Sequence, residues 1–172
     1  KAALNIRTVM RSPDVIGVVE VASKAALQSL ADQVNADAVA AGDVNPQYVA
    51  ELVPFGTGSQ QVGFLVRSAR VLISTVTQAR ATDTFVNPAT GLPELLHDRP
   101  PLVLEATVDP AGQAPAKIIV VVNHLRSFID IERLDDEGLR VRAKRKAQAE
   151  AVAELLAELQ TANPATPVIA VG

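Results

Sequence analysis

The spacing of apolar residues predicts a helix over residues 23–34, which read SKAALQSLADQV. Four apolar side chains follow the i, i+3, i+4, i+7 spacing of one helical face: Leu27, Leu30, Ala31 and Val34. Ser23 stands where an N-cap residue would accept a hydrogen bond from the first turn. This segment is therefore expected to pack its apolar face against a core.

A second helical pattern covers residues 140–160. Its apolar face is formed by Val152, Leu155, Leu156 and Leu159. The basic run RVRAKRK, residues 140–146, opens this pattern, and such a run is usually a solvated helix face. A helix N-terminus disfavours positive charge, so the upstream acids of DIERLDDE or a phosphate-rich partner would offset the placement.

Short runs rich in β-branched residues predict strands between and around these helices. The runs are DVIGVVEV (14–21), VGFLVR (62–67), VLISTVTQ (71–78), LVLEATV (102–108), KIIVVVN (117–123) and VIAVG (168–172). Most are continuously apolar rather than alternating, which is typical of strands covered on both faces. The succession of helices and strands predicts a layered α/β domain.

Composition narrows the possible chemistry. The chain has 172 residues, which suits one domain, and its net charge of −3 provides no overall basic field for nucleic acid. It contains no cysteine, which excludes disulfides, thiolate nucleophiles and cysteine zinc sites. It also lacks a glycine-rich phosphate loop, an HExxH motif, an EF-hand loop and a GxSxG elbow. No run is long enough to predict a membrane span, and the N-terminus lacks the apolar block of a signal peptide.

Two apolar strands end in side chains suited to phosphoryl chemistry. Glu20 is a carboxylate near the end of one strand, and His124 follows five apolar residues of another. A carboxylate is a hard ligand for Mg²⁺, and an imidazole can hold or move a proton. The simpler alternatives are that Glu20 extends into water at the sheet edge and that His124 is structural. Asn123 and Ser127, which flank His124 in sequence, could merely cap a turn.

Arg99 is a third candidate. It precedes Pro100 and Pro101, which hold the local backbone extended, so its guanidinium could grip a phosphate with two hydrogen bonds. The alternative is a surface arginine paired with Asp98. His97 lies in the same loop and has no partner visible in the sequence.

These segments together resemble the endonuclease/exonuclease/phosphatase superfamily, also called DNase I-like. PDVIGVVEV is similar to its PD-I-I-G-L-Q-E-V signature, DRPPLVLEATV to its Arg-Pro-Pro strand, and VVVNHLRS to its Asn-His-Leu-Lys/Arg-Ser strand end. KRKAQAEAVAELLAEL resembles the helix that follows, and PVIAVG the strand that leads into its Gly-Asp-x-Asn motif. The stretch from NHLRSFIDIE to RAKRKAQAE looks most like bacterial extracellular or surface nuclease-like members.

The resemblance implies a four-layer α/β/β/α sandwich with two mixed sheets, and hydrolysis of phosphoesters with Mg²⁺ or Mn²⁺, with nucleic acid as the expected substrate. By position, Glu20 would be a metal ligand and His124 the catalytic imidazole, while Asn123 and Arg99 would place phosphate oxygens. The same reading requires Glu20 and His124 to emerge side by side at one rim of the sheets. It also implies an extracellular or cell-surface location in a bacterium.

The chain departs from the family pattern at both ends. Residues 1–172 would form a partial domain, because the family's first Asn-bearing strand and its motifs beyond Gly172 are not included. Upstream of VGFLVR, where the family carries a polar or acidic residue, the nearest groups are Gln60 and Gln61. Impaired activity is therefore expected for this stretch alone. Two alternatives stay open: a lipid or inositol phosphate hydrolase of the same fold, and a non-catalytic binding module.

Overall fold

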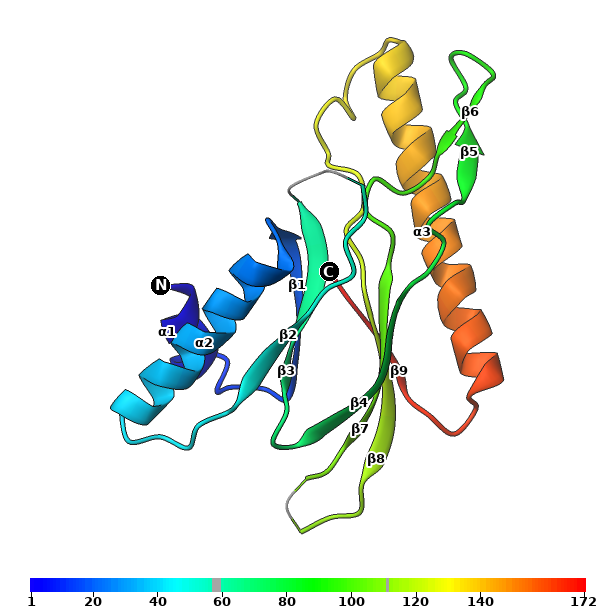
Figure 1. Cartoon of the computed structure of the whole chain (residues 1–172). Helices are drawn as coiled ribbons and strands as arrows, with labels where there is room; N and C mark the ends of the chain where they lie inside the picture. The colour runs from blue at the N-terminus through cyan, green and yellow to red at the C-terminus, as the bar shows by residue number, and fades with distance from the viewer. Residues whose placement is uncertain (57–59, 111) are drawn as a thin grey trace.

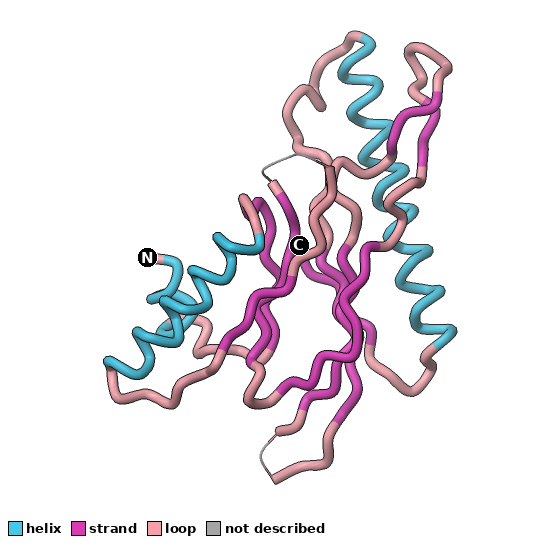
Figure 2. Tube along the Cα trace, in the orientation of Figure 1, coloured by secondary structure: helices cyan, strands magenta, loops and turns pink. Residues whose placement is uncertain are grey.

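The protein is a four-layer sandwich in which helices lie outside two stacked sheets (Figures 1 and 2). The computed structural model describes residues 1–56, 60–110 and 112–172. Helices α1 (Ala2–Thr8) and α2 (Lys24–Ala40) form one outer layer, and α3 (Asp136–Ala162) forms the other. The α/β/β/α sandwich expected from the sequence is confirmed. No helix in the described ranges combines the length and apolar character that a membrane span needs.

The first sheet has the strand order β1-β3-β2 and is antiparallel throughout. Its strands are β1 (Val15–Val21), β3 (Gln61–Arg67) and β2 (Tyr48–Glu51). The apolar face predicted for α2 packs on this sheet through Leu27, Ala31 and Val34, which contact a cluster that includes Tyr48 and Leu65. The Ser23 hydroxyl accepts a hydrogen bond from Ala26 N–H at 3.1 Å, so Ser23 is the N-cap of α2.

The second sheet has the order β4-β7-β8-β9 and is mixed. Its strands are β4 (Val71–Gln78), β7 (Leu102–Val108), β8 (Ala116–Val122) and β9 (Val168–Val171). Strands β8 and β9 are parallel because α3 carries the chain back along the outside of the sheet, whereas the other pairs are antiparallel. The expectation of two mixed sheets was therefore wrong for the first sheet: among the described strands, only the second sheet is mixed.

The main core lies between the two sheets. Phe64, Val66, Leu102, Leu104 and Val122 are fully buried there and contact one another across the layer. Gly17 of β1 lies directly against the second sheet, because a Cβ added there would lie 2.5 Å from Val171 Cγ2 and 3.2 Å from Val122 Cγ2. The continuous apolar runs are explained by this double burial.

Several elements were not predicted from the sequence. Strand β2 and the hairpin of β5 (Thr84–Val86) and β6 (Pro93–Leu95) are too short to leave a clear periodic pattern. Helix α3 begins at Asp136, earlier than the periodicity indicates, and Asp135 is its N-cap, accepting from Gly138 N–H at 3.2 Å. The acids before the basic run are therefore the cap and first turn of α3, where the helix dipole favours them.

The expectation that residues 140–146 form a solvated helix face was wrong. Lys144 is buried and its Nζ lies 2.8 Å from Asp98 Oδ1. Arg140 is paired with Glu137 at 2.8 Å and Glu94 at 3.2 Å. Arg142 and Lys146 match the expectation, because both are exposed. Lys144 and Arg140 instead face the loops at one end of the second sheet.

Candidate active site

Glu20 is placed by an irregularity in β1. The register between β1 and β3 shifts between Val18 and Val21, which marks a β-bulge, and Glu20 has a φ of 59°. A left-handed conformation costs a residue with a Cβ about 1 kcal/mol or more, and such strain clusters at functional sites. The bulge turns the Glu20 side chain out of the regular strand alternation and leaves it exposed at the end of the sheet.

His124 comes from the other sheet, two residues beyond the end of β8. Its Nε2 lies 3.6 Å from Glu20 Oε1. The His124 side chain is 19% exposed and the Glu20 side chain is 57% exposed. The pair therefore lies at the surface, and the histidine is the more buried partner. The expectation that these side chains emerge side by side at one rim is confirmed, although they lie about a hundred residues apart in the chain.

The pKa of His124 is lowered from its ordinary value. Burial is the largest cause, the positive charge of Arg99 adds to it, and the Glu20 carboxylate acts in the opposite direction. The imidazole is therefore mostly neutral near neutral pH, with one ring nitrogen able to accept a proton. Its Nδ1 is buried and has no hydrogen-bond partner among the described residues.

Asn123 is held at the junction of β8 and β9. Its backbone N–H donates to Val171 O at 2.9 Å, and its Nδ2 lies 3.4 Å from both Val121 O and Val171 O. The side-chain Oδ1 is buried without a hydrogen-bond partner in the described part of the chain. Gly172 passes so close that a Cβ there would meet Asn123 O at 2.2 Å. The amide is thus fixed by backbone, with one oxygen left to accept a further hydrogen bond.

Arg99 lies near this pair and is bound by a residue of the first sheet's loop. Its Nη2 donates to Gln60 Oε1, and its charge acts on the His124 imidazole. The alternative in which Arg99 pairs with Asp98 was wrong, because Asp98 is paired with Lys144. The other upstream residue, Gln61, is buried and holds the backbone of Phe55 through two hydrogen bonds of 2.9 and 3.0 Å.

The remaining candidates have structural positions. Ser127 accepts from Ile129 N–H at 3.1 Å, so it caps the turn after His124. His97 is 2% exposed, and burial lowers its pKa most, with the nearby charges of Asp83 and Lys144 acting in opposite directions. It lies in the core beneath the Arg99 segment rather than at the rim.

The carboxylates and imidazoles of the described residues do not form a complete metal cage. No group of three or more Asp, Glu or His side chains in residues 1–56, 60–110 and 112–172 is arranged to hold a metal ion. Mg²⁺ commonly binds through one or two carboxylates and completes its shell with water and substrate phosphate. The exposed Glu20 carboxylate fits that mode of binding and does not fit a closed structural site.

Residues of α3 that the sequence reasoning missed surround the loop after β8. The Arg145 guanidinium lies 3.8 Å from the centre of the Phe128 ring and donates to Arg126 O. Gln148 is fully buried and bonds to the backbone of the same loop. A cleft of about 600 Å³ lies beside His124 and is lined by Asn123, Leu125, Phe128, Arg145, Ala149, Val152 and residues 170–172. In the sequence, these contacts were signalled only by the basic run of residues 140–146, whose positive charges are electrostatically unfavourable at the start of the predicted helix.

The arrangement of the layers is the DNase I-like fold, which is the fold that the sequence resemblance implied. The structure is similar to D. rerio TDP2 complexed with a single-strand DNA product, with a TM-score of 0.51 and 19% identity over 98% of this chain and 51% of that chain. It is also similar to the human Nocturnin catalytic domain with a bound sulfate anion, with a TM-score of 0.51 and 14% identity over 98% and 53% of the two chains.

These likenesses establish the fold and leave the activity to be argued from the site. The chain spans about half the length of the structures it matches. Its sequence matches no family model and no curated protein.

Proposed function

We propose that the protein is a metal-dependent phosphodiesterase of nuclease type. One observation carries the proposal: Glu20 and His124 come from different sheets and meet at 3.6 Å on one rim, with Arg99 near enough to act on the imidazole. A carboxylate, an imidazole and a guanidinium are the groups that metal-assisted phosphoester hydrolysis requires. The left-handed backbone of Glu20 supports the proposal, because strain of this kind clusters at functional sites.

Each side chain has a distinct role in this proposal. Glu20 would hold Mg²⁺ or Mn²⁺, which neutralises developing negative charge and lowers the pKa of a bound water. His124 hydrogen-bonds a phosphoryl oxygen or takes up a proton during the reaction. Arg99 binds a non-bridging phosphate oxygen, for which it must exchange its bond to Gln60. Asn123 would bind the same phosphate through its Nδ2–H group, for which Nδ2 must leave one of its long contacts to Val121 O and Val171 O.

Nucleic acid is the favoured substrate. D. rerio TDP2 holds a single-strand DNA product and human Nocturnin a sulfate anion, an analogue of phosphate, in structures of this fold. Arg145 and the exposed Phe128 ring line the cleft next to His124, and such groups can contact a nucleotide. A lipid or inositol phosphate hydrolase is the alternative, and the extracellular or cell-surface location stays a prediction.

Plasmid cleavage by the full-length protein tests the proposal, with Mg²⁺ compared against EDTA. Cleavage should require the metal, and His124→Ala should reduce the rate about 10²- to 10⁴-fold, the usual contribution of acid–base catalysis. Lys146→Ala on exposed α3 surface is the control and should cleave at the wild-type rate. Unchanged cleavage by His124→Ala would remove this residue from the mechanism, and no cleavage of any phosphodiester would favour a binding module.

Calorimetry tests the metal ligand separately from activity. Mg²⁺ and Mn²⁺ should bind the wild type and bind Glu20→Gln more weakly, because the neutral amide removes the charge that attracts the ion. Glu150→Gln, an exposed carboxylate on α3, is the matched control and should leave affinity unchanged. Equal affinity in Glu20→Gln would assign Glu20 a surface role instead.

A further inference from the structure

One buried side chain joins the two segments that carry His124 and Arg99. Gln148 of α3 is 0% exposed, and its Oε1 accepts from Arg126 N–H at 2.7 Å. Its Nε2 donates to Leu96 O at 2.8 Å. Arg126 lies two residues after His124, and Leu96 lies three residues before Arg99. The Gln148 amide therefore links the loop that follows β8 to the loop that precedes β7.

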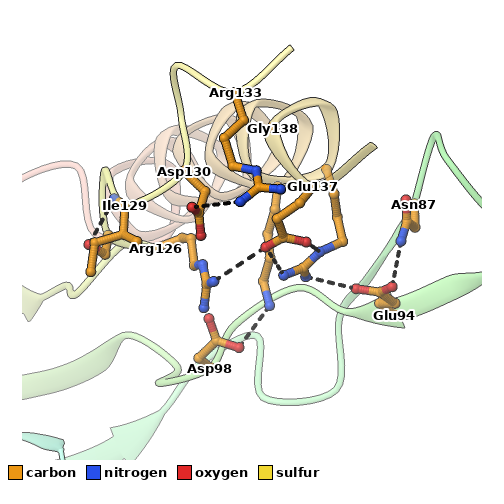
Figure 3. Close-up of polar contacts among 12 residues, drawn as sticks. Asn87, Glu94, Asp98, Arg126, Ile129, Asp130, Arg133, Glu137 and Gly138 are labelled. Carbon is orange, nitrogen blue, oxygen red and sulfur yellow. Dashed lines mark hydrogen bonds and ion pairs between the residues drawn. The ribbon is translucent and has the colours of Figure 1, made fainter. Parts of the chain in front are cut away.

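Other α3 residues strengthen the hold on the His124 loop. Arg145, three residues before Gln148, donates to Arg126 O, so both backbone polar groups of Arg126 bond to α3 side chains. The Arg126 guanidinium lies 3.7 Å from Glu137 in the first turn of α3, an ion pair visible in Figure 3. The loop after β8 is thus bound to α3 both through the backbone of Arg126 and through its side chain.

The Arg99 segment is tied to the same helix by an ion pair between a buried lysine and an exposed aspartate. Lys144, one helical turn before Gln148, places its Nζ 2.8 Å from Asp98 Oδ1 and 5.8 Å from the centre of the Phe85 ring. Asp98 directly precedes Arg99, and its bond crosses from the loop to the helix in Figure 3. An ammonium group is costly to bury without a partner, so this contact is specific.

The His124 imidazole itself has few direct supports. Its Nδ1 has no partner within the described ranges, and the Glu20 side chain that contacts it is 57% exposed. The position of the imidazole therefore depends on the backbone of the loop, which Gln148 and Arg145 hold. The Gln148 amide accepts from one backbone group through its oxygen and donates to the other through its nitrogen.

We propose that Gln148 is a positioning residue for phosphoester hydrolysis, one that sets the location of His124 relative to Arg99. The positioning itself is inferred from the hydrogen bonds of Gln148. Its effect on catalysis rests on the proposed function. Losing the amide releases two buried backbone groups, and the loop then shifts to satisfy them. A shift of about 1 Å at a reacting group can lower a rate about 100-fold.

Gln148→Met tests this proposal because methionine keeps the length of the side chain and removes both hydrogen bonds. Two measurements are made on the full-length protein at fixed pH: the imidazole NMR signals of His124, and the hydrolysis of bis(4-nitrophenyl) phosphate with Mg²⁺. Leu155→Ala, two turns further along α3, is the control, because it removes buried apolar contacts without touching either loop. Both variants are measured below their unfolding transitions.

The expected result is a shift of the His124 signals and a 10- to 100-fold lower kcat in Gln148→Met, with KM changed less than about twofold. Leu155→Ala should lower thermal stability and leave the signals and kcat near wild type. Unshifted His124 signals in Gln148→Met would overturn the proposal whatever the kinetics show. If the wild type fails to hydrolyse the diester, the proposed function fails while the NMR comparison still decides the positioning.

A second variant covers the case in which Gln148→Met does not fold. Arg145→Met removes the bond to Arg126 O from a more exposed site and should move the His124 signals in the same direction by a smaller amount. Signals identical to wild type in Arg145→Met would show that α3 does not position the loop.

Discussion

Substituting Gly17 with alanine should separate the two sheets and disturb the Glu20–His124 pair together. The new Cβ would lie 2.5 Å from Val171 Cγ2 and 3.2 Å from Val122 Cγ2, whereas carbon atoms normally pack at about 3.5–4.0 Å. Val171 is partly exposed and can rotate away, but Val122 is fully buried and cannot. The sheets must therefore move apart by a few tenths of an ångström at this point.

Overpacking of this kind costs about 1–3 kcal/mol of unfolding free energy. For a chain of this length each kcal/mol lowers Tm by about 2–4 °C, so Gly17→Ala should melt about 2–12 °C below wild type. Gly17 lies three residues before Glu20, and Val122 lies two residues before His124. The displacement should lengthen the 3.6 Å contact between the Glu20 and His124 side chains and reduce the proposed phosphodiesterase activity.

Gly63→Ala is the matched control because Gly63 lies in the same sheet and faces the helix layer. A Cβ there would meet Glu51 O and Leu27 Cδ2, both at 2.8 Å, and Leu27 belongs to α2. Urea unfolding should show a loss of stability in both variants, and a crystal structure should show a longer Glu20–His124 distance only in Gly17→Ala. A Gly17→Ala protein with wild-type stability and an unchanged 3.6 Å contact would refute the packing argument.

Two further predictions concern stability alone. Burial lowers the pKa of His97, so the unfolded chain takes up a proton more readily than the folded protein, and stability should fall as pH drops below about 6.5. Urea unfolding at about pH 7.5 and pH 5.5 should therefore show that lowering the pH reduces the free energy of unfolding less in His97→Asn than in wild type. An equal reduction in both proteins would mean that His97 stays accessible to protons in the folded state. Ser23→Ala removes the N-cap of α2 and should lower the free energy of unfolding by about 1 kcal/mol, as measured by thermal unfolding. Diester hydrolysis should not change. A changed kcat would mean that α2 affects the candidate site.

The sequence by itself determined the elements that have a long apolar pattern, and the features that depend on neighbouring residues in the chain, such as a helix cap. The apolar face of α2, its Ser23 cap and the buried runs of β7 and β8 followed from periodicity and burial on both faces. The resemblance of PDVIGVVEV and NHLRS to one superfamily then supplied the fold and the candidate pair of Glu20 and His124. Short elements such as β2 and the β5–β6 hairpin carry too few residues to show a period.

Only the tertiary structure decided what the polar residues of α3 do. In sequence, Lys144 belongs to a basic run that reads as a solvated surface, and Gln148 lies just beyond that run with no signal of its own. In the fold both side chains are buried and hold the loops of Asp98 and Arg126. The bulge that aims Glu20 was equally hidden. Hydrogen bonds and ion pairs act over a few ångströms in space, and residues that lie 46 or 52 positions apart leave no periodic trace of such contacts.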